Sequence, residues 1–383
     1  MKLYRDADGH TALALQASLS ILIALGLWNA TAEWSPILAL WSVGRPWWLT
    51  LAPRALVVAL FLCALAMSAG VRVRVAALTL AALAAALYAL APAVYHNNYY
   101  LLWLVTLALA MAPHPDHSVA RVTAAEKPSP RPWPPALAVF LRAQVTIVYW
   151  VSVAVKLSHP MWGGTGHAIQ WITTTRAPDS AFGLVNPLLR PLLSRPVLAA
   201  LSEWAIVGLE LCLPLLLFNP RTRRSGVALG AAMHVVMQEW LFPQVFSFVM
   251  LLGYFAFIEG GDRAFTVRFD PRNSFDRALA AHYPRVDWMG RTRWLPLDTP
   301  GPLALDDHGV ERRELAALRV LVAVTPATVL AYAALALLAP GADTVLTLPR
   351  AAVENLLVAG VSLGFIPGLL DRPFARLRRA LDD

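Results

Sequence analysis

The sequence has little charge and very little cysteine. Only 15% of its 383 residues are charged, whereas a soluble domain usually carries about a quarter. The two cysteines, Cys63 and Cys212, lie in separate apolar runs and form no C-x-x-C pair. This pattern argues against a disulfide framework and predicts two buried, inert thiols.

The sequence also lacks the short motifs that mark many soluble enzymes. It contains no H-E-x-x-H, no P-loop, no G-x-G-x-x-G and no nucleophile elbow. His114 and His117 have H-x-x-H spacing but no companion cluster, so we predict no metal site. The net charge of +8 comes without basic helices that interleave aromatic residues, so we also predict no nucleic-acid partner.

Long apolar runs are what the sequence has instead. Hydrophobic residues make up 58% of the chain, and the mean hydropathy is +0.55. A helix that crosses a bilayer needs about 20 mostly apolar residues. The predicted fold class is therefore all-α integral membrane, a polytopic bundle of about ten transmembrane helices. The ten runs cover 11–28, 53–71, 75–94, 97–113, 135–157, 197–218, 225–241, 242–258, 315–339 and 350–370.

Two places interrupt this pattern of crossings. The segment 36–52 is apolar but contains Pro36 and Pro46, so we expect an interfacial or re-entrant piece there. Phe242 and Pro243 interrupt a stretch that is too long for one crossing. We expect a tight turn between two helices at that point, rather than one kinked helix.

The distribution of lysine and arginine orients the helices. If the N-terminus is cytoplasmic, 23 of the 32 Lys and Arg residues fall in cytoplasmic segments, 7 fall outside and 2 lie within helices. Cytoplasmic loops of membrane proteins carry such an excess. We therefore predict cytoplasmic termini and the lipid bilayer as the immediate partner. The Ala-, Arg- and Pro-rich composition favours a bacterial cytoplasmic (inner) membrane.

Two loops are long enough to fold on their own. The outer loop 158–196 is aromatic and contains Pro and Gly, which predicts a folded cap. The inner segment 259–314 predicts a small cytoplasmic α+β segment, with a strand over 264–270 and a helix over 275–283. The chain then divides into a membrane domain over 1–258, the segment 259–314, and a part over 315–383 with two transmembrane helices and a basic tail.

Polar residues within the apolar runs are the candidate functional residues, because ionisable groups are costly in a bilayer. Lys156 closes the fifth run at its outer end, either as a snorkelling lysine or as a desolvated general base. His96, Asn97 and Asn98 lie at the outer end of the fourth run. They form either part of an interfacial belt or a polar binding site.

Two further pairs of polar residues lie deeper in the bilayer. Glu203 and Glu210 are seven residues apart and therefore share one face of a helix. Glu210 must be protonated or paired there, and Arg142 and His234 are the candidate partners. His234 and Gln238 are four residues apart and also share a face. These residues form either a buried clamp between helices or part of a catalytic site.

Three stretches in register carry a resemblance to a known family. They are His96 to Leu102 with Ser118-Val119, Val148 to Leu157 with Trp162-Gly163-Gly164, and Glu210 through Met233-His234 to Leu252. Together they resemble the HTTM domain, the membrane domain of vitamin K-dependent gamma-carboxylase and its bacterial relatives. The resemblance covers residues 10–260.

The resemblance implies a carboxylase-like enzyme that uses a reduced quinone of the vitamin K or menaquinone type, with O2 and CO2 and without a metal. Lys156 matches the lysine regarded in that family as the base that deprotonates the quinone. Glu210 and His234 are expected to support it as catalytic residues. The residues expected to bind quinone or substrate are His96, Asn97, Asn98, Tyr149 and Trp162.

One position departs from the carboxylase pattern. Asn98 stands where the carboxylase has a histidine that is assigned a role near the carbanion. His96 is two residues away and on a helix would point elsewhere. Quinone deprotonation is therefore better supported than glutamate carboxylation.

A second, weaker resemblance covers residues 263–298. Val267 to Asp270 and Val286 to Gly290 resemble the DCC family of small thioredoxin-like modules. Asn273 and Asp276 occupy the positions of that family's two cysteines. The resemblance then implies that a thiol redox function is lost and that the segment is a relic or an interaction module.

Two functions from different classes remain open. The first is an epoxidase or carboxylase-like lyase that acts on a peptide or small molecule at the extracytoplasmic side, with Lys156 as base. The alternative is a non-enzymatic protein of a secreted-peptide maturation or export system, which binds a peptide or lipid. A transporter is disfavoured, because the sequence has no evident inverted repeat. The discriminating feature is whether Lys156 faces a lipid-accessible cavity or a dry helix interface.

Overall fold

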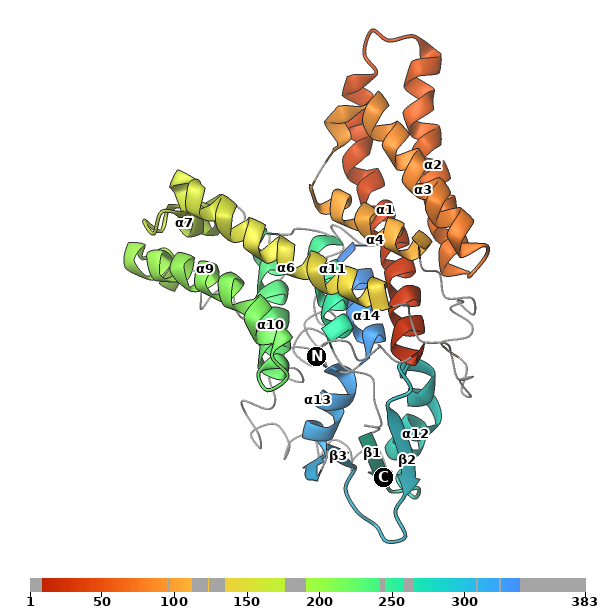
Figure 1. Ribbon diagram of the computed structural model, residues 1–383. Coiled ribbons are helices and arrows are strands. Elements are labelled where there is room, and N and C mark those ends of the chain that lie inside the picture. Colours follow the sequence, from red (N-terminus) through yellow and green to blue (C-terminus); the bar gives the residue numbers. More distant parts are fainter. Residues whose placement is uncertain are drawn as a thin grey trace.

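The chain folds into three parts that pack together, and most of its described residues are helical (Figure 1). They are an N-terminal bundle, a group of helices that includes the long α6 and α9, and a small module around a four-stranded sheet. The computed structural model describes residues 9–95, 97–111, 123, 135–175, 191–241, 245–257, 265–307, 309–323 and 325–337.

The N-terminal bundle consists of four consecutive helices. They are α1 (Gly9–Trp41), α2 (Trp47–Ser68), α3 (Val73–Leu90) and α4 (Asn97–Met111). Each packs against the next, and α1 is buried between its neighbours along most of its length. A short 3-10 turn, η1 (Pro92–Val94), connects α3 to α4.

The segment 36–52, predicted as an interfacial or re-entrant piece, is not a separate element, and its position relative to the bilayer remains a prediction. α1 continues through Pro36 to Trp41, and α2 already begins at Trp47. A proline inside a helix removes one backbone hydrogen bond. Pro36 is exposed, and α1 continues past it for five more residues.

The second group contains α6 (Pro135–Ser158) and α9 (Pro196–Phe218), which pack against each other (Figure 1). Proline at the first position of each helix fits the fixed φ that a helix start requires. Between them lie a 3-10 turn, η2 (Pro160–Trp162), and the short helix α7 (His167–Thr175), which packs on α9. Both elements belong to the predicted outer cap over 158–196.

Three further helical elements connect this pair to the bundle. They are α10 (Arg223–Leu241), α11 (Val245–Gly253) with the 3-10 turn η4 (Tyr254–Phe257), and α14 (Pro326–Leu337). α11 is buried among α1, α4, α10 and α14. The predicted turn at 242–243 lies outside the described residues, but helices begin and end on both sides of it as expected.

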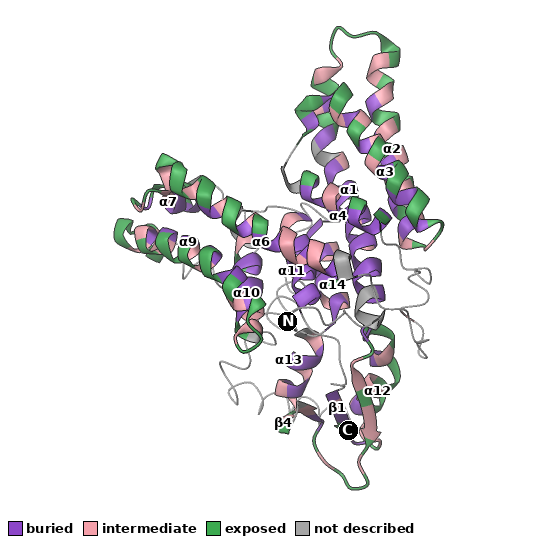
Figure 2. Cartoon of the chain, viewed as in Figure 1, coloured by how far each residue is buried: buried purple, intermediate pink, exposed green. Residues whose placement is uncertain are grey.

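The outer faces of the long helices are exposed (Figure 2), and many of the exposed side chains there are apolar. Exposed leucines and valines occur along α2, α3, α6 and α9, for example Leu62, Val75, Val155 and Leu211. Such surfaces need a lipid environment, because water would disfavour so large an apolar area. Cys212 is exposed on this surface and Cys63 is half-buried, so the prediction that both thiols are buried is wrong.

Among the described residues, five helices are long and apolar enough to cross a membrane, and a bent pair raises the number to six. They include the predicted runs 53–71, 75–94, 135–157 and 197–218. α4, α10 and α11 are apolar but shorter. The run 350–370 lies outside the described residues, so ten crossings with both termini cytoplasmic remain a prediction.

The run 315–339, predicted as one transmembrane helix, is broken into two helices, and whether the pair forms one crossing remains a prediction. The chain forms α13 (Leu315–Ala323) and α14 instead, and they are bent by 77° relative to each other. α14 packs against α1 and α11, whereas α13 packs against the sheet. An apolar run of this length has the same sequence pattern whether it crosses a bilayer or packs against two different hydrophobic cores.

The small module contains four strands and two helices. They are β1 (Phe265–Phe269), α12 (Ser274–Val286), β2 (Thr292–Pro296), β3 (Ala304–Asp307), β4 (Val310–Arg313) and α13. The strand order is β2-β1-β3-β4. β1 is parallel to β2 and antiparallel to β3, and β3 is antiparallel to β4. The predicted strand over 264–270 and helix over 275–283 are confirmed.

Candidate functional site

An ion pair joins α6 to α9. The Nζ atom of Lys156, in the last turn of α6, lies 2.5 Å from both carboxylate oxygens of Glu210 on α9. Nζ also donates to the Ser152 hydroxyl at 2.9 Å and lies 5.0 Å from the centre of the Trp162 ring. The Lys156 side chain is 13% exposed and that of Glu210 is 3% exposed. The pair is therefore desolvated, and the amine retains a small open side.

A second polar group lies further along the same face of α6. Tyr149, Ser152 and Lys156 are spaced by three and four residues, which places them on one face. Their spacing puts Tyr149 about 10 Å along the helix axis from Lys156. The Tyr149 hydroxyl is hydrogen-bonded to Nε2 of His234 on α10 at 2.7 Å, and also to the Tyr254 hydroxyl. All three side chains are buried.

Two buried groups on α10 retain unused hydrogen-bonding capacity. Among the residues that the structure describes, Nδ1 of His234 is buried without a hydrogen-bond partner, and neither amide atom of Gln238 has one. The two residues lie one turn apart on a shared buried face, as predicted. A buried polar group without a partner costs about 1–3 kcal/mol. These atoms therefore have hydrogen bonds to offer to a ligand or a water molecule.

Glu203 has a different role from Glu210. Its two carboxylate oxygens accept hydrogen bonds from the backbone N–H groups of Gly166 and Ala168, at 3.0 and 2.9 Å. Both donors lie at the beginning of α7, where a negative charge is stabilised by the helix dipole. Gly166 has φ of +81° and leaves no room for a Cβ against Pro196 and Ala199. For Glu203, the interpretation as a structural clamp is therefore the one that the contacts support.

The structure brings five of the predicted site residues into two neighbouring groups. Lys156, Glu210 and Trp162 form the first, and Tyr149 and His234 belong to the second. His96 lies outside the described residues. Asn97 and Asn98 form the first turn of α4, but their side chains are also outside the described part.

The predicted partners of Glu210 differ from the observed one. The expected candidates were Arg142 and His234, whereas the carboxylate is paired with Lys156. Arg142 instead donates from Nε to the Ala256 carbonyl at 2.7 Å, and His234 bonds to Tyr149. A residue 54 positions away in sequence gives no periodic signal, so only the packing of α6 on α9 identifies it.

Tyr254 is a site residue that the sequence did not indicate. It lies in η4, and its hydroxyl bonds to that of Tyr149, 105 positions earlier. A lone tyrosine in an apolar run is usually part of the core. The sequence feature related to Tyr254 is Gly230 on α10. A Cβ at position 230 would overlap the Tyr254 ring.

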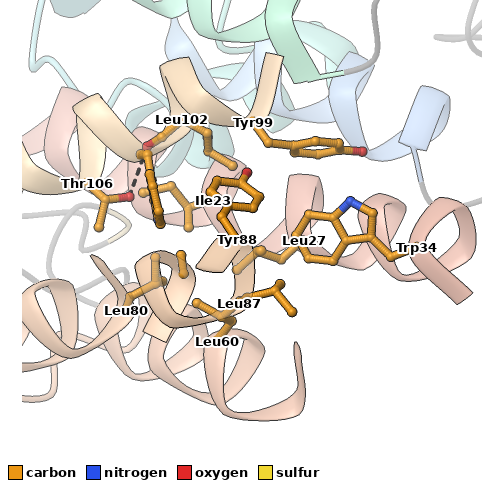
Figure 3. Close-up of a pocket in the computed structure, with 12 residues that line it drawn as sticks. Ile23, Leu27, Trp34, Leu60, Leu80, Leu87, Tyr88, Tyr99, Leu102 and Thr106 are labelled. Atoms are coloured by element: carbon orange, nitrogen blue, oxygen red, sulfur yellow. Dashed lines mark hydrogen bonds between the residues drawn. The ribbon is translucent and has the colours of Figure 1, made fainter. Parts of the chain in front are cut away.

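An apolar cavity lies elsewhere in the molecule, between helices of the N-terminal bundle (Figure 3). Leucines from four helices and the rings of Trp34, Tyr88 and Tyr99 line it. The Tyr99 ring stacks edge-on against Trp34, and its hydroxyl accepts a hydrogen bond from Asn29 at 3.4 Å. Since its walls come from α1 to α4, this cavity is distinct from the site around Lys156.

Comparison with known protein families shows to which family this chain belongs. The profile of the HTTM domain matches residues 15–260, which include every helix from α2 to α11. The chain belongs to the HTTM family. Searches of curated proteins and of solved structures find no match. The two polar groups around Lys156 and Tyr149 therefore lie inside the HTTM domain.

Membership of the HTTM family makes the chain a membrane protein, in agreement with its apolar helices. The site residues and their roles do not follow from that membership. The DCC resemblance also remains a prediction. The positions of the missing cysteines fall at the start of α12, where Asn273 caps the helix by accepting from the Asp276 N–H at 3.0 Å.

Proposed function

We propose that this HTTM protein is a membrane enzyme in which Lys156 and Glu210 take a proton from a reduced quinone. The observation that carries the proposal is the Lys156–Glu210 pair, held at 2.5 Å between two apolar helices. The pair is largely shielded from water, because the side chains of Lys156 and Glu210 are 13% and 3% exposed. A proton that moves from Nζ to the carboxylate leaves a neutral amine, which can act as a base.

The residues around the pair fit a quinone ring. Trp162 offers an aromatic face beside Nζ, and the open side of Lys156 is where a ring hydroxyl can approach. Tyr149, His234 and Tyr254 form a hydrogen-bonded chain further along α6. Nδ1 of His234 has no hydrogen-bond partner in the described part of the chain. When bound, a reduced quinone would supply two acidic ring hydroxyl groups and a ring that O2 can oxidise.

We propose no carboxylation step. The histidine that the carboxylase uses is replaced by Asn98 in this chain. Use of CO2 therefore rests on the resemblance alone. A peptide or small molecule at the extracytoplasmic side is the second substrate in this proposal, and the bacterial cytoplasmic membrane is the proposed location. Lys156 then lies near the outer end of α6, with both chain termini in the cytoplasm.

A second function is favoured by the same contact. Each group of the Lys156–Glu210 pair is the hydrogen-bond partner of the other. In this second function the pair has a purely structural role. It holds α6 and α9 together, and Glu203 holds α7 on α9. The protein would then be a non-enzymatic component of secreted-peptide maturation or export that binds a peptide or lipid.

Oxidation of reduced menaquinone by the purified protein tests the proposal. We expect O2-dependent formation of the quinone epoxide by the wild type and its loss in Lys156→Met. The chain has two other lysines, and Lys127→Met in the predicted cytoplasmic loop is the control. Epoxide formation that Lys156→Met leaves unchanged would reject Lys156 as the base. No epoxide from folded wild-type protein would favour the non-enzymatic function.

A further inference from the structure

The helices α10 and α11 bury polar side chains whose hydrogen-bonding capacity is unused. Gln238 and Ser247 are 0% exposed, and His234 is 1% exposed. Among the described residues, neither amide atom of Gln238, nor the Ser247 hydroxyl, nor Nδ1 of His234 has a hydrogen-bond partner. By contrast, the buried hydroxyls of Ser18 and Ser20 on α1 each donate to the carbonyl four residues earlier, at 2.6 and 2.8 Å. Since buried polar groups are nearly always paired, the groups on α10 and α11 indicate a partner from outside the chain.

The packing of α10 on α11 places these groups along one interface (Figure 1). α11 begins four residues after α10 ends and packs back against it, so the two helices run in opposite directions. The His234 ring lies 5.7 Å from the Phe246 ring and 6.0 Å from the Tyr254 ring, between centres. Gln238, one turn further along α10, is therefore level with the first turn of α11, which contains Ser247. Ser247 is also two turns before Tyr254 and so lies on the same side of α11.

Water is the ligand whose chemistry matches these groups. The Gln238 amide offers both donors and an acceptor, and the Ser247 hydroxyl can donate or accept. A buried water molecule typically makes about three hydrogen bonds to polar groups that otherwise have no partner. The three side chains are at most 1% exposed, which disfavours a larger polar ligand. A metal ion is disfavoured as well, because the described residues contain no cluster of three or more His, Cys, Asp or Glu side chains that could hold one.

We propose that ordered water binds at the α10–α11 interface, to Gln238, Ser247 and Nδ1 of His234. The other ring nitrogen of His234, Nε2, is hydrogen-bonded to the Tyr149 hydroxyl at 2.7 Å, and that hydroxyl is bonded to the Tyr254 hydroxyl. The water therefore extends this hydrogen-bonded chain from the two tyrosines to α11. It also holds the imidazole from its second nitrogen, so that the ring keeps its orientation toward Tyr149.

Radiolytic labelling of the purified full-length protein tests for this water. A short X-ray pulse converts bound water into hydroxyl radicals, which oxidise a methionine side chain beside it. Met250 lies midway between Phe246 and Tyr254, so it shares their face of α11. Met250 is 1% exposed, and Met67 on α2, at 0%, is the matched buried control. We expect oxidation of Met250 to be several-fold faster than that of Met67.

Substitution of the polar groups should remove the label. Gln238→Leu and Ser247→Ala each take away hydrogen bonds to the water, and we expect either to slow oxidation of Met250 to the rate of Met67. Ser18→Ala should leave the label unchanged, because the Ser18 hydroxyl already donates to a carbonyl of its own helix. Gln238→Leu should also lower the unfolding temperature, because it leaves the remaining partners of the water buried. In a dry interface, removal of an unpaired amide would raise that temperature instead.

The outcomes separate this water site from the proposed function. The site goes beyond that function, because it requires neither a quinone nor proton transfer at Lys156. Lys156→Met is therefore expected to leave the oxidation of Met250 unchanged. Equally slow oxidation of Met250 and Met67 in the wild type would overturn the proposal, as would a higher unfolding temperature for Gln238→Leu. Labelling of Met250 that neither substitution at 238 or 247 changes would also overturn it.

Discussion

Lys156 and Glu210 form an ion pair across the interface of α6 and α9, with 2.5 Å between Nζ and each carboxylate oxygen. Each residue would be costly alone in an apolar interface. Together they reduce that cost and fix the relative position of the two helices. The remaining question is whether the pair also exchanges protons with a substrate, and the stability and the activity of variants separate these two roles.

The ion pair predicts unequal stabilities for single and double variants. Lys156→Met leaves the Glu210 carboxylate buried without a partner, and Glu210→Met does the same to the amine. Loss of one partner of a buried pair costs about 3–5 kcal/mol, whereas replacement of both by apolar residues is often neutral. We expect the double variant to unfold near the wild-type temperature in detergent. A double variant as unstable as either single variant would contradict this.

Two glycines provide a matched test of the tyrosine–histidine group. A Cβ at Gly230 would overlap the Tyr254 hydroxyl and ring, whereas a Cβ at Gly208 on α9 meets no heavy atom of the other described elements within 4 Å. Gly230→Ala should displace Tyr254 and destabilise the protein by about 1–3 kcal/mol. Gly208→Ala should stabilise it by up to about 1 kcal/mol, as expected in a helix. Thermal unfolding compares the two, and equal effects would show that Tyr254 is not tightly packed.

Glu203 should act on α7 rather than on chemistry. In Glu203→Gln the side chain can accept only one of the two backbone hydrogen bonds, and the charge at the helix start is lost. We expect a loss of about 1–2 kcal/mol. Hydrogen exchange should accelerate at residues 166–175 and remain unchanged in α2 and α3. Loss of turnover without this local change would place Glu203 in the site instead.

Tyr283 makes the small module sensitive to alkaline pH. Burial, and then the charge of Asp287, raise the pKa of Tyr283 well above its ordinary value, and its hydroxyl donates to the Leu321 carbonyl at 2.7 Å. The unfolded tyrosine loses its proton near pH 10. The folded state holds the proton more tightly, so stability is full below about pH 10 and falls as pH rises above it.

The Tyr283→Phe variant checks this dependence. The substitution removes the titrating hydroxyl and one buried hydrogen bond, so we expect a constant loss of about 1 kcal/mol below pH 10. Above pH 10 the stability of the variant should fall less steeply than that of the wild type. Parallel curves for both proteins in denaturant unfolding would show that Tyr283 does not determine the alkaline behaviour.

The sequence predicted most of the helices, because apolar runs of about 20 residues usually form membrane-spanning helices. It failed where one pattern has two structural solutions. The run 315–339 became two helices that cover different cores, α13 on the sheet and α14 against α1. Pro36 looked like a helix end, yet α1 continues through it.

The candidate site was predictable residue by residue but not as a set of contacts. Residue type and position within the apolar runs indicated Lys156, Glu210 and His234. Helix spacing correctly placed His234 and Gln238 on one buried face. Which helices pack together decides the partners, and that depends on side-chain shape along whole helices. Neither the Lys156–Glu210 contact nor the role of Tyr254 follows from local pattern.

The turnover of the double variant Lys156→Met/Glu210→Met tests the central claim most directly. This variant removes both proton-transferring groups and retains apolar packing between α6 and α9. Assayed with reduced menaquinone and O2 beside the wild type, it should be folded and form no quinone epoxide. If the folded double variant forms epoxide at the wild-type rate, the pair is only a structural clamp and the proposed chemistry is wrong.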